Sequence, residues 1–460
     1  MVHDAHGWWL REAGGAAPVA PAAGELDADV VVIGGGYAGM WTAWNLLGRG
    51  ARVVLLEAHV CGHGPSGRNG GFCETLWSNL PSLRERFGDE RALAACEASS
   101  ESVRAIGDWC EAEGVDAWFH LGGFVETSTS EAQDPVIDEI LASAQLAPGK
   151  VVPLDADAVR ARCDSPRFRK GLFVPDDATV QPARLALGLR RRLLEQGARI
   201  HERSRVRALT THADGVVAET GAARVRAGAA VLTINAATRG VRPLRSRLSV
   251  TSSHIVLTEP VPEVLDKIGW TGGESITDGR TFLHYFRTTR DGRIAFGTGA
   301  MQPGLARSIG PAFDWHRPFV AEVARQFRAL FPTFADIPLE AGWGGPIDVS
   351  GAHLPFVGRS FGGTVHHAAG FTGNGVGPCR LVGQILARRV LGMEDELTRL
   401  PIVDFEPKRF PPEPLRSTGA LLVNSAVLRL DRAEDADCAA DPLTGLVARL
   451  PRRLGYHLGP

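Results

Sequence analysis

The feature that most constrains the fold is a glycine-rich segment near the start of the 460-residue chain. Four apolar residues at 30–33 run directly into the pattern Gly34-x-Gly36-x-x-Gly39, and an amphipathic segment follows at 40–47. A β-forming run, a glycine-rich turn and a helical pattern in this order predict a strand–turn–helix unit. Such a unit can bind the phosphates of a nucleotide.

The glycines and the segment beyond the helix make this interpretation more specific. Gly34 allows the tight turn, Gly36 lets the backbone approach a pyrophosphate, and Gly39 lets the helix pack closely on the strand. The helix N-terminus offers free N–H groups to the phosphates. A second buried strand is predicted at 52–56 and ends at Glu57, which is placed to accept the hydroxyl hydrogens of an adenosine ribose. The competing interpretation is an ordinary tight turn, and Glu57 argues against it.

Composition places the chain among globular proteins. Hydrophobic residues make up 44% and charged residues 22%, and the formal net charge of -2 gives no electrostatic reason to expect nucleic acid as a partner. The seven cysteines are scattered and never in CxxC spacing, which favours reduced thiols in a cytoplasmic protein and argues against a metal site. No apolar run approaches the ~18 residues that a membrane span needs, so we expect no transmembrane helix.

Helical and strand patterns alternate along the rest of the chain. A nicotinamide-binding domain would continue after Glu57 with a third buried strand, but a glycine-rich loop at 61–72 follows here. Alternation between 250 and 301 predicts an antiparallel sheet. Helices are predicted at 80–113, 134–145, 155–162, 182–196, 319–331 and 376–391, and strands at 119–126, 198–202, 205–210, 216–220, 224–226, 229–233, 253–257, 282–287 and 293–297.

Three separated blocks of the sequence resemble one protein family. They are the N-terminal βαβ pattern with its loop at 66–71, the middle block with Val174-Pro175 and Arg205-Val206, and a block from 343 to 376. In this order they resemble the FAD-dependent amine oxidoreductases of the D-amino-acid oxidase superfamily. The chain is most similar there to the γ-glutamylputrescine oxidoreductase type, near the sarcosine and glycine oxidases.

The resemblance implies an α/β (α+β) fold with two interleaved domains. One is a Rossmann-like FAD-binding domain of the glutathione-reductase type, and the other is an antiparallel-sheet substrate domain. We expect the FAD-binding domain to comprise 27–115, 171–240 and 341–400, the substrate domain to comprise 116–170 and 241–340, residues 1–26 to form an N-terminal segment, and residues 401–460 to form a C-terminal extension that packs on the outside.

The resemblance also implies which residues bind FAD. In similar enzymes the loop at 66–71 passes beside the flavin and the pyrophosphate, the position of Val206 contacts the adenine side, and the turn at 373–376 faces the flavin pyrimidine ring. Backbone N–H groups at a helix N-terminus would stabilise the negative charge of reduced flavin. The predicted FAD-binding residues are Gly34, Gly36, Tyr37, Ala38, Gly39, Glu57, Ala58, Ser66, Gly67, Arg68, Asn69, Gly70, Gly71, Val206, Gly373, Asn374, Gly375 and Val376.

Residues that tether flavin or activate oxygen in related enzymes do not occur at the matching positions. Some sarcosine oxidases carry a cysteine in the region of 340–345, and related dehydrogenases carry a histidine where this chain has Arg68-Asn69. We therefore expect noncovalent FAD. Oxygen-using relatives often hold a lysine in the sheet that spans 285–299, which has none here. The electron acceptor, oxygen or another, stays open.

The resemblance implies oxidation of an amine or amino acid. No second GxGxxG follows, so the substrate itself must reduce the flavin: hydride passes to flavin N5 from a C–H beside the amine nitrogen, and the imine is hydrolysed to a carbonyl. The sequence identifies no catalytic acid or base. None is needed if the amine enters the site as a neutral molecule. Candidates for the substrate side are His254, His284, Tyr285, Arg287, Trp343 and His367.

Two of these candidates share one face of a predicted strand. Tyr285 and Arg287 alternate in an extended segment and so point to the same side. The arginine could clamp a carboxylate or phosphonate, or it could form an ordinary ion pair or face solvent. For His254 and His284, the alternative to a role in proton transfer is a purely structural role in the core.

Two other functions stay open on the same scaffold. One is an FAD-dependent dehydrogenase of a 2-hydroxy acid or a polyol phosphate. The other is a flavoprotein that binds FAD without catalysis. A hydroxy acid would reduce the flavin in the first case, and no donor would reduce it in the second.

Overall fold

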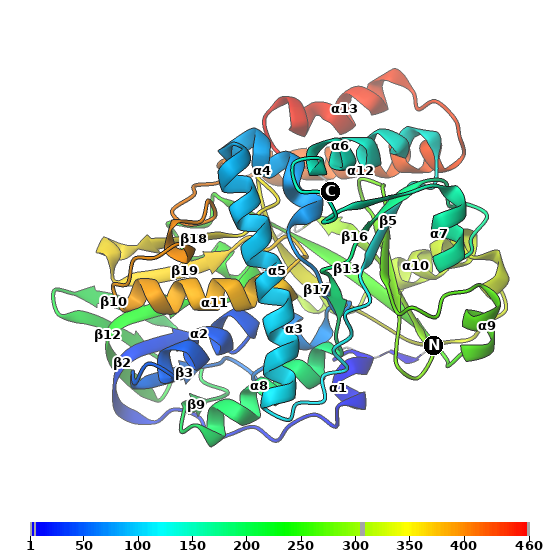
Figure 1. The fold of residues 1–460 in the computed structure, drawn as a ribbon. Helices are drawn as coiled ribbons and strands as arrows, with labels where there is room; N and C mark the ends of the chain where they lie inside the picture. The colour runs from blue at the N-terminus through cyan, green and yellow to red at the C-terminus, as the bar shows by residue number, and fades with distance from the viewer. Residues whose placement is uncertain (1, 4–5, 304–308, 458–460) are drawn as a thin grey trace.

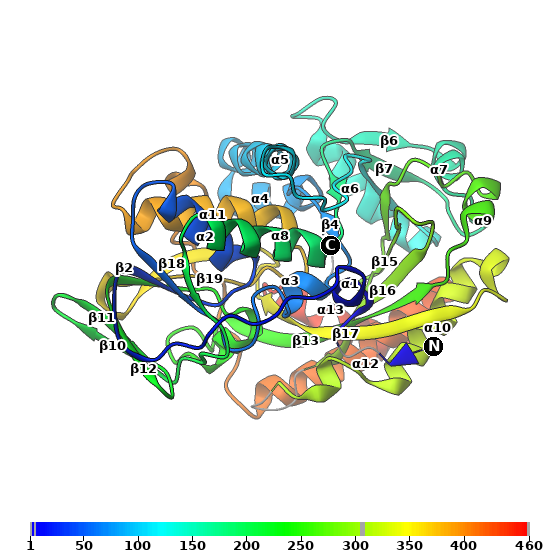
Figure 2. The same cartoon turned by 90° about the horizontal axis from the view of Figure 1, so that it is seen from below.

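The computed structural model describes residues 2–3, 6–303 and 309–457. These residues form two large sheets with helices packed around them (Figure 1, Figure 2). The helices are α1 (Trp8–Glu12), α2 (Tyr37–Leu47), α3 (Pro65–Arg68), α4 (Leu80–Phe87), α5 (Asp89–Ala112), α6 (Asp134–Ala144), α7 (Ala156–Arg162), α8 (Pro182–Glu195), α9 (Pro262–Lys267), α10 (Arg317–Leu330), α11 (Val376–Val390), α12 (Leu415–Asp435) and α13 (Pro442–Arg453).

The first sheet contains the glycine-rich unit. Its path runs β10 (Ala208–His212), β11 (Gly215–Glu219), β12 (Ala223–Leu232), β2 (Gly24–Ile33), β3 (Val53–Leu56) and β9 (Arg199–His201), and β19 (Val365–Ala369) joins β12 to β18 (Phe356–Ser360). The strands from β19 through β12, β2 and β3 to β9 run parallel, whereas β10 and β11 form an antiparallel hairpin on β12. Parallel strands buried by helices read as continuous apolar runs, as the segments at 30–33 and 53–56 do.

One strand of this sheet corrects the sequence prediction. Residues 224–226 and 229–233 were predicted as separate strands, but both belong to β12. β2 pairs with β12 on either side of Gly228, and this long partner keeps the backbone extended through the glycine. The N-terminal half of β12 completes the hairpin, and its C-terminal end pairs with β19.

The second sheet has nine strands and is mainly antiparallel. Their order is β1 (Val2–His3), β17 (Leu339–Ser350), β13 (Leu248–Thr258), β16 (Ile294–Pro303), β15 (His284–Thr288), β14 (Ser275–Asp278), β5 (Phe124–Thr127), β7 (Gly171–Val174) and β6 (Val152–Leu154). Helix α10 packs on β13, β16 and β17, and aromatic rings of Phe286, Phe296 and Phe327 fill the space below it.

The fold class predicted from the sequence is confirmed, with local corrections. β7 and β17 lie in the nine-stranded sheet, although 171–174 and 341–350 were predicted for the FAD-binding part. The helical pattern at 80–113 is divided into α4 and α5 at Gly88, whose φ of 80° interrupts the helix. The strand predicted at 119–126 is regular only at β5, and β14 was not predicted.

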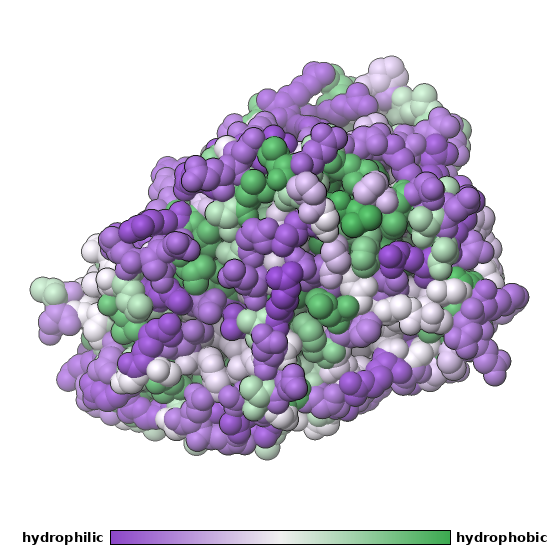
Figure 3. Space-filling model, viewed as in Figure 1, coloured by the Kyte–Doolittle hydropathy of each residue, from purple (hydrophilic) through white to green (hydrophobic). Residues whose placement is uncertain are grey.

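Two further observations concern the surface. The face seen in Figure 3 is largely hydrophilic, and its hydrophobic atoms gather in the upper half, near α4 and α6. Within the described ranges, no helix combines the length and the apolar character that crossing a membrane requires.

A buried ion pair ties the N-terminal segment to the first sheet. Glu202 is fully buried, and its carboxylate accepts hydrogen bonds from the Arg190 guanidinium at 2.7 and 2.9 Å. It also accepts from the backbone N–H groups of Cys61 at 2.8 Å and Val19 at 2.7 Å. Burial alone would raise the pKa of Glu202, but the bonds from Arg190, Cys61 and Val19 lower the pKa below its ordinary value.

Removing the cation should destabilise the fold measurably. Arg190→Met leaves Glu202 buried without its partner, and we expect a loss of about 3–5 kcal/mol in the free energy of unfolding at neutral pH. Because the pKa of Glu202 is lowered, the wild-type stabilisation exists above the ordinary glutamate pKa and disappears as the pH falls through the folded value. The difference between the proteins should therefore narrow in acid, as measured by denaturant unfolding at several pH values.

The same helix offers a control for this substitution. Arg191 pairs with Glu195 at 3.4 Å, and its side chain is 52% exposed. Arg191→Met should change the free energy of unfolding by less than about 1 kcal/mol, because exposed ion pairs contribute little. Equal effects of the two substitutions would contradict the argument.

Candidate active site

A cavity of about 1350 Å³ opens between the two sheets. At one end it reaches the glycine turn between β2 and α2, and at the other it passes beneath α12. Strands β13, β14, β15 and β5 of the nine-stranded sheet form one wall, and the turn before α11 forms another. The cavity therefore joins the glycine turn to a chamber beside the second sheet.

The glycine turn has the close packing that the sequence predicted. Gly34 has a φ of 109°, and a Cβ atom at Gly39 would lie 2.0 Å from the Gly34 carbonyl oxygen. Glu57 at the end of β3 accepts a hydrogen bond from the Gly35 N–H at 2.7 Å, and from His59 N–H at 2.8 Å. The carboxylate is thus fixed beside the glycine turn, and its remaining lone pairs are available to accept further hydrogen bonds.

The loop at 61–72 is held against this turn by side chains. The Ser66 hydroxyl accepts a hydrogen bond from the Tyr37 N–H at 2.9 Å, which connects α3 to the start of α2. The Trp343 indole donates to the Arg68 carbonyl oxygen at 2.8 Å. The Arg68 guanidinium forms an ion pair with Asp314 at 2.7 Å. The loop therefore takes one fixed path along the cavity.

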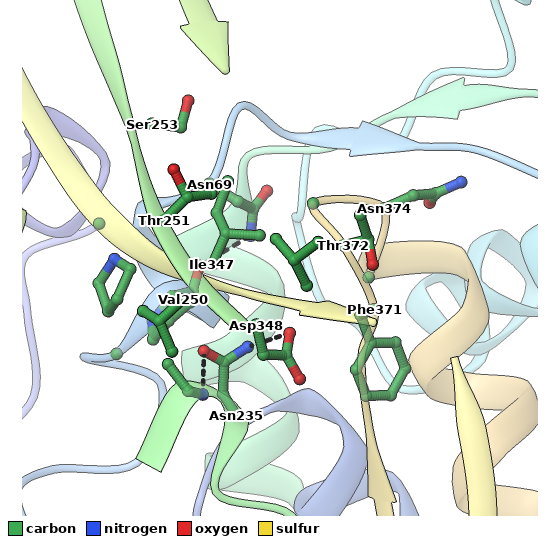
Figure 4. Close-up of a pocket in the computed structure, with 18 of the residues that line it drawn as sticks. Asn69, Asn235, Val250, Thr251, Ser253, Ile347, Asp348, Phe371, Thr372 and Asn374 are labelled. Atoms are coloured by element: carbon green, nitrogen blue, oxygen red, sulfur yellow. Dashed lines mark hydrogen bonds between the residues drawn. The ribbon is translucent and has the colours of Figure 1, made fainter. Parts of the chain in front are cut away.

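The turn before α11 brings polar groups of several elements together (Figure 4). Asp348 of β17 is fully buried, and its carboxylate accepts from the Gly370 N–H at 2.6 Å and from Asn235 Nδ2 at 3.2 Å. Burial raises the pKa of Asp348 to about 7. Asn374 Nδ2 donates to the Thr75 carbonyl oxygen at 3.2 Å, whereas Asn374 Oδ1 is buried and has no hydrogen-bond partner.

The predicted FAD-binding residues collect at this cavity. All of them line it except Gly39, Gly67 and Gly71, which support the walls. A Cβ at Gly67 would lie 2.2 Å from the Gly62 carbonyl oxygen, so this glycine permits close backbone packing. The glycines leave room for a cofactor, and the buried Asn374 oxygen provides an unused acceptor, so the residues fit FAD.

The substrate candidates divide between the cavity and the core. Tyr285 lines the cavity, and its hydroxyl lies 2.6 Å from the hydroxyl oxygen of Ser253. Arg287 points to the same side, as the alternation predicted, but does not line the cavity. Its guanidinium donates to the carbonyl oxygens of Gly71 at 2.9 Å and Val180 at 2.5 Å. Arg287 is 2% exposed, and burial lowers its pKa to about 9.

The other four candidates also lie outside the cavity lining. His254 is fully buried on the α10 side of β13, and burial lowers its pKa to about 4. His367 is buried in β19, with a pKa lowered to about 4 by burial. His284 Nδ1 lies 2.6 Å from an Asp278 carboxylate oxygen, and Trp343 supports the Arg68 loop. We propose no substrate contact for these residues or for Arg287.

The carboxyl groups that line the cavity and that the sequence prediction omitted include Glu74, Glu126 and Asp177. Burial raises the pKa of Glu126 to about 8 and that of Asp177 to about 7, and raises the pKa of Glu74 well above its ordinary value. Glu126 lies within a strand, and Glu74 and Asp177 lie in loops, so no motif in the neighbouring sequence distinguishes them from other acidic residues. Only the pairing of distant segments places them together.

The C-terminal helices also contribute to the cavity. Residues 401–460 were predicted to pack on the outside, but α12 lines the far end of the cavity with Leu415, Arg416, Gly419, Ala420, Val423 and Asn424. Figure 1 shows α12 and α13 at the edge of the molecule, and Arg452 of α13 lies 3.8 Å from Glu139 of α6. This correction matters because the extension helps to define which molecules the chamber accepts.

Comparison with known proteins agrees with this geometry. Residues 29–389 match the family described as DAO, FAD dependent oxidoreductase. The chain belongs to this family. The match spans the glycine turn, both sheets and α11, so the predicted FAD-dependent oxidoreductase is confirmed.

Relatives in the family cover most of the chain. It is 27% identical to a probable oxidoreductase OrdL from Rhizobium meliloti, over 83% of this chain and 87% of the relative. It is 25% identical to the gamma-glutamylputrescine oxidoreductase of Escherichia coli, over 91% of this chain and 97% of the relative. The crystal structure of glycine oxidase from Geobacillus kaustophilus superposes with a TM-score of 0.67 at 20% identity, over 80% of this chain and 96% of that one.

The close contact at Gly39 gives a test of the cofactor site. Gly39→Ala places a methyl group against the Gly34 carbonyl oxygen and should push α2 away from the turn. We expect FAD binding to weaken at least about tenfold, which corresponds to about 1.4 kcal/mol. Flavin absorbance per protein after gel filtration, followed by titration of apoprotein with FAD, measures the change.

Gly48→Ala is the matched control at the other end of α2. A Cβ at Gly48 meets its nearest atom at 3.4 Å, and the residue has an ordinary φ of -61°. This variant should retain wild-type flavin content. Full occupancy in Gly39→Ala would show that the close packing is not needed for the cofactor.

Proposed function

We propose that this FAD-dependent oxidoreductase oxidises an amine at the carbon beside its nitrogen and gives an imine, which water hydrolyses to a carbonyl. The observation that carries the proposal is the chamber that adjoins the flavin-facing turn. It is lined by carboxyl and hydroxyl groups on the strands of the second sheet. Amines bind such groups as hydrogen-bond donors and as cations. Two of its relatives are named for the oxidation of molecules that contain an amine: a gamma-glutamylputrescine oxidoreductase and a glycine oxidase.

The residues of the chain would hold the cofactor and orient the substrate. FAD, when bound, would supply the acceptor for the hydride, which carries both electrons of the oxidation. The residues from Gly34 to Ala38 and Glu57 would hold its pyrophosphate and ribose, and the start of α11 would stabilise negative charge on the reduced ring. The Tyr285–Ser253 pair would hydrogen-bond the amine nitrogen.

The charge of the chamber favours an amine over an amino acid. The cavity-lining residues of β5, β13, β14 and β15, all within the described ranges, include no arginine or lysine. Arg287, which could have clamped a carboxylate, is committed to the carbonyl oxygens of Gly71 and Val180. A substrate carboxylate would therefore find no cationic partner on these strands, and its charge would stay unpaired. Amino acids are therefore expected to be the poorer substrates.

A 2-hydroxy acid or a polyol phosphate fits the chamber less well. Both carry negative charge, and the strands of the chamber wall supply no arginine or lysine to pair with it. We accordingly place amine oxidation ahead of these chemistries and ahead of a role without catalysis. The electron acceptor is proposed to be oxygen or another small acceptor, with no nucleic acid as partner. The buried cysteines are free thiols, in keeping with the proposed cytoplasmic location.

The first experiment is anaerobic titration of the purified flavoprotein with amines, amino acids, 2-hydroxy acids and polyol phosphates. We expect amines to bleach the flavin absorbance and hydroxy acids to leave it unchanged. Admission of air then tests whether oxygen restores the absorbance. Reduction by a hydroxy acid alone would overturn the substrate class, and a flavin that no donor reduces would indicate a protein without this activity.

The attachment of the cofactor can be tested separately. Segment 340–345 carries no cysteine, and Cys379 lies inside α11. We propose noncovalent FAD, so precipitation of the protein with acid should leave all flavin in the supernatant. Yellow colour retained in the washed precipitate would show a covalent bond, and mass spectrometry of its peptides would locate the attachment.

A further inference from the structure

The chamber holds a group of carboxyl side chains to which the proposed reaction assigns no individual roles. Glu126 lies on β5, and Glu74 and Asp177 lie on the loops that follow β4 (Phe72–Cys73) and precede β8 (Ala178–Thr179). All three line the cavity. The neighbouring charges that raise their pKa values are other carboxyls: Asp177 and Glu126 act on Glu74, and Asp278 acts on Glu126.

Glu126 is the member that points to a ligand. Glu126 is 1% exposed, and its Oε1 atom has no hydrogen-bond partner within the described residues. A buried carboxyl oxygen without a partner costs free energy, so such an atom is a candidate for completion by a bound molecule. Asp177 is satisfied on one side, because its Oδ1 accepts from the Thr75 N–H at 2.7 Å.

The registers of the second sheet fix where Glu126 lies. It is directly opposite Thr277 of β14, which is directly opposite Tyr285 of β15. Residues that face each other across strands point to the same side of a sheet, and all three line the cavity. Two strand spacings put Glu126 roughly 10 Å from Tyr285 along this wall.

The cluster also adjoins the flavin-facing turn. Thr75 connects the two, because its N–H binds Asp177 and its carbonyl oxygen accepts from Asn374 at 3.2 Å. A molecule that extends from this turn along the wall would therefore pass the carboxyl groups. Its reacting end would lie near Tyr285 and its other end near Glu126.

We propose that Glu126, with Glu74 and Asp177, forms a subsite for a second ammonium group of the substrate, and that the substrate class is the α,ω-diamines and longer polyamines. This inference rests on the proposed amine oxidation and names its substrate class. One nitrogen is oxidised at the flavin while the distal ammonium donates hydrogen bonds to Glu126 Oε1 and its neighbours. A carboxylate or an uncharged alkyl end lacks these donors.

Other charged groups near Glu126 support a cation at this place. Asp278 of β14 is paired with His284 at 2.6 Å. The Arg280 guanidinium lies 2.8 Å from a His284 ring nitrogen, so Arg280 is directed toward His284. Glu74 also lies near Glu126, because the charges of Asp177 and Glu126 add to burial in raising the pKa of Glu74. Because the pKa of Glu126 is raised to about 8 by burial, a diamine should bind more tightly as the pH rises toward that value.

The test compares an α,ω-diamine with the n-alkylamine of the same carbon number on the FAD-loaded enzyme. Binding is followed by the change in flavin absorbance and by thermal shift of the oxidised protein, and reduction is followed anaerobically. We expect the wild-type enzyme to bind 1,4-diaminobutane at least about 30-fold more tightly than n-butylamine. Glu126→Gln should remove most of this preference and leave binding of n-butylamine within about twofold.

Glu131→Gln is the matched control, because this glutamate lies near β5 on the same segment but its side chain is 83% exposed. It should retain the full preference. Equal affinity of the wild-type enzyme for the two amines would overturn the subsite, as would a Glu126→Gln variant that loses both equally. If neither amine reduces the flavin, the proposed function fails, and the thermal shift with the diamine still decides whether the subsite binds a dication.

Discussion

The long antiparallel pairing of β13 with β17 is the constraint on which the site depends. The two strands stay in register from Leu248 with Ser350 to Leu257 with Ala341. This pairing aligns Thr251 with Ile347 and Ser253 with Gly345 on the side that faces the cavity. Because side chains alternate along a strand, the opposite face carries His254 into the core against α10.

β17 also links the two parts of the molecule. Its Trp343 holds the Arg68 carbonyl of the cofactor loop, and its Asp348 holds the Gly370 N–H of the segment that leads to α11. One strand of the nine-stranded sheet thereby positions both loops that the sequence predicts to contact FAD. A shift in its register by one residue would exchange buried and cavity-facing side chains along its whole length.

The buried carboxyl groups in the chamber reduce the stability of the folded protein. Raised pKa values at Glu126 and Asp177 mean that their ionised forms are disfavoured in the folded protein. The folded state is therefore penalised as the pH rises through these values. Replacement by apolar residues would avoid this cost, so the retained carboxyls are best explained by a ligand that stabilises their charge.

The sequence by itself determined the βαβ unit with its close packing at Gly34 and Gly39, because both depend on residues close together in the chain. It also determined the family, because the order of three separated motif blocks needs no tertiary structure to be seen. It also predicted most helices, whose ends follow from prolines and glycines. It could not determine the substrate wall. Arg287 and His254 were candidates but are buried, Arg287 against two backbone carbonyl oxygens and His254 against α10, whereas no local pattern marked Glu126. Strand pairing over long separations decides which side chains meet in a cavity, and only the tertiary structure contains that pairing.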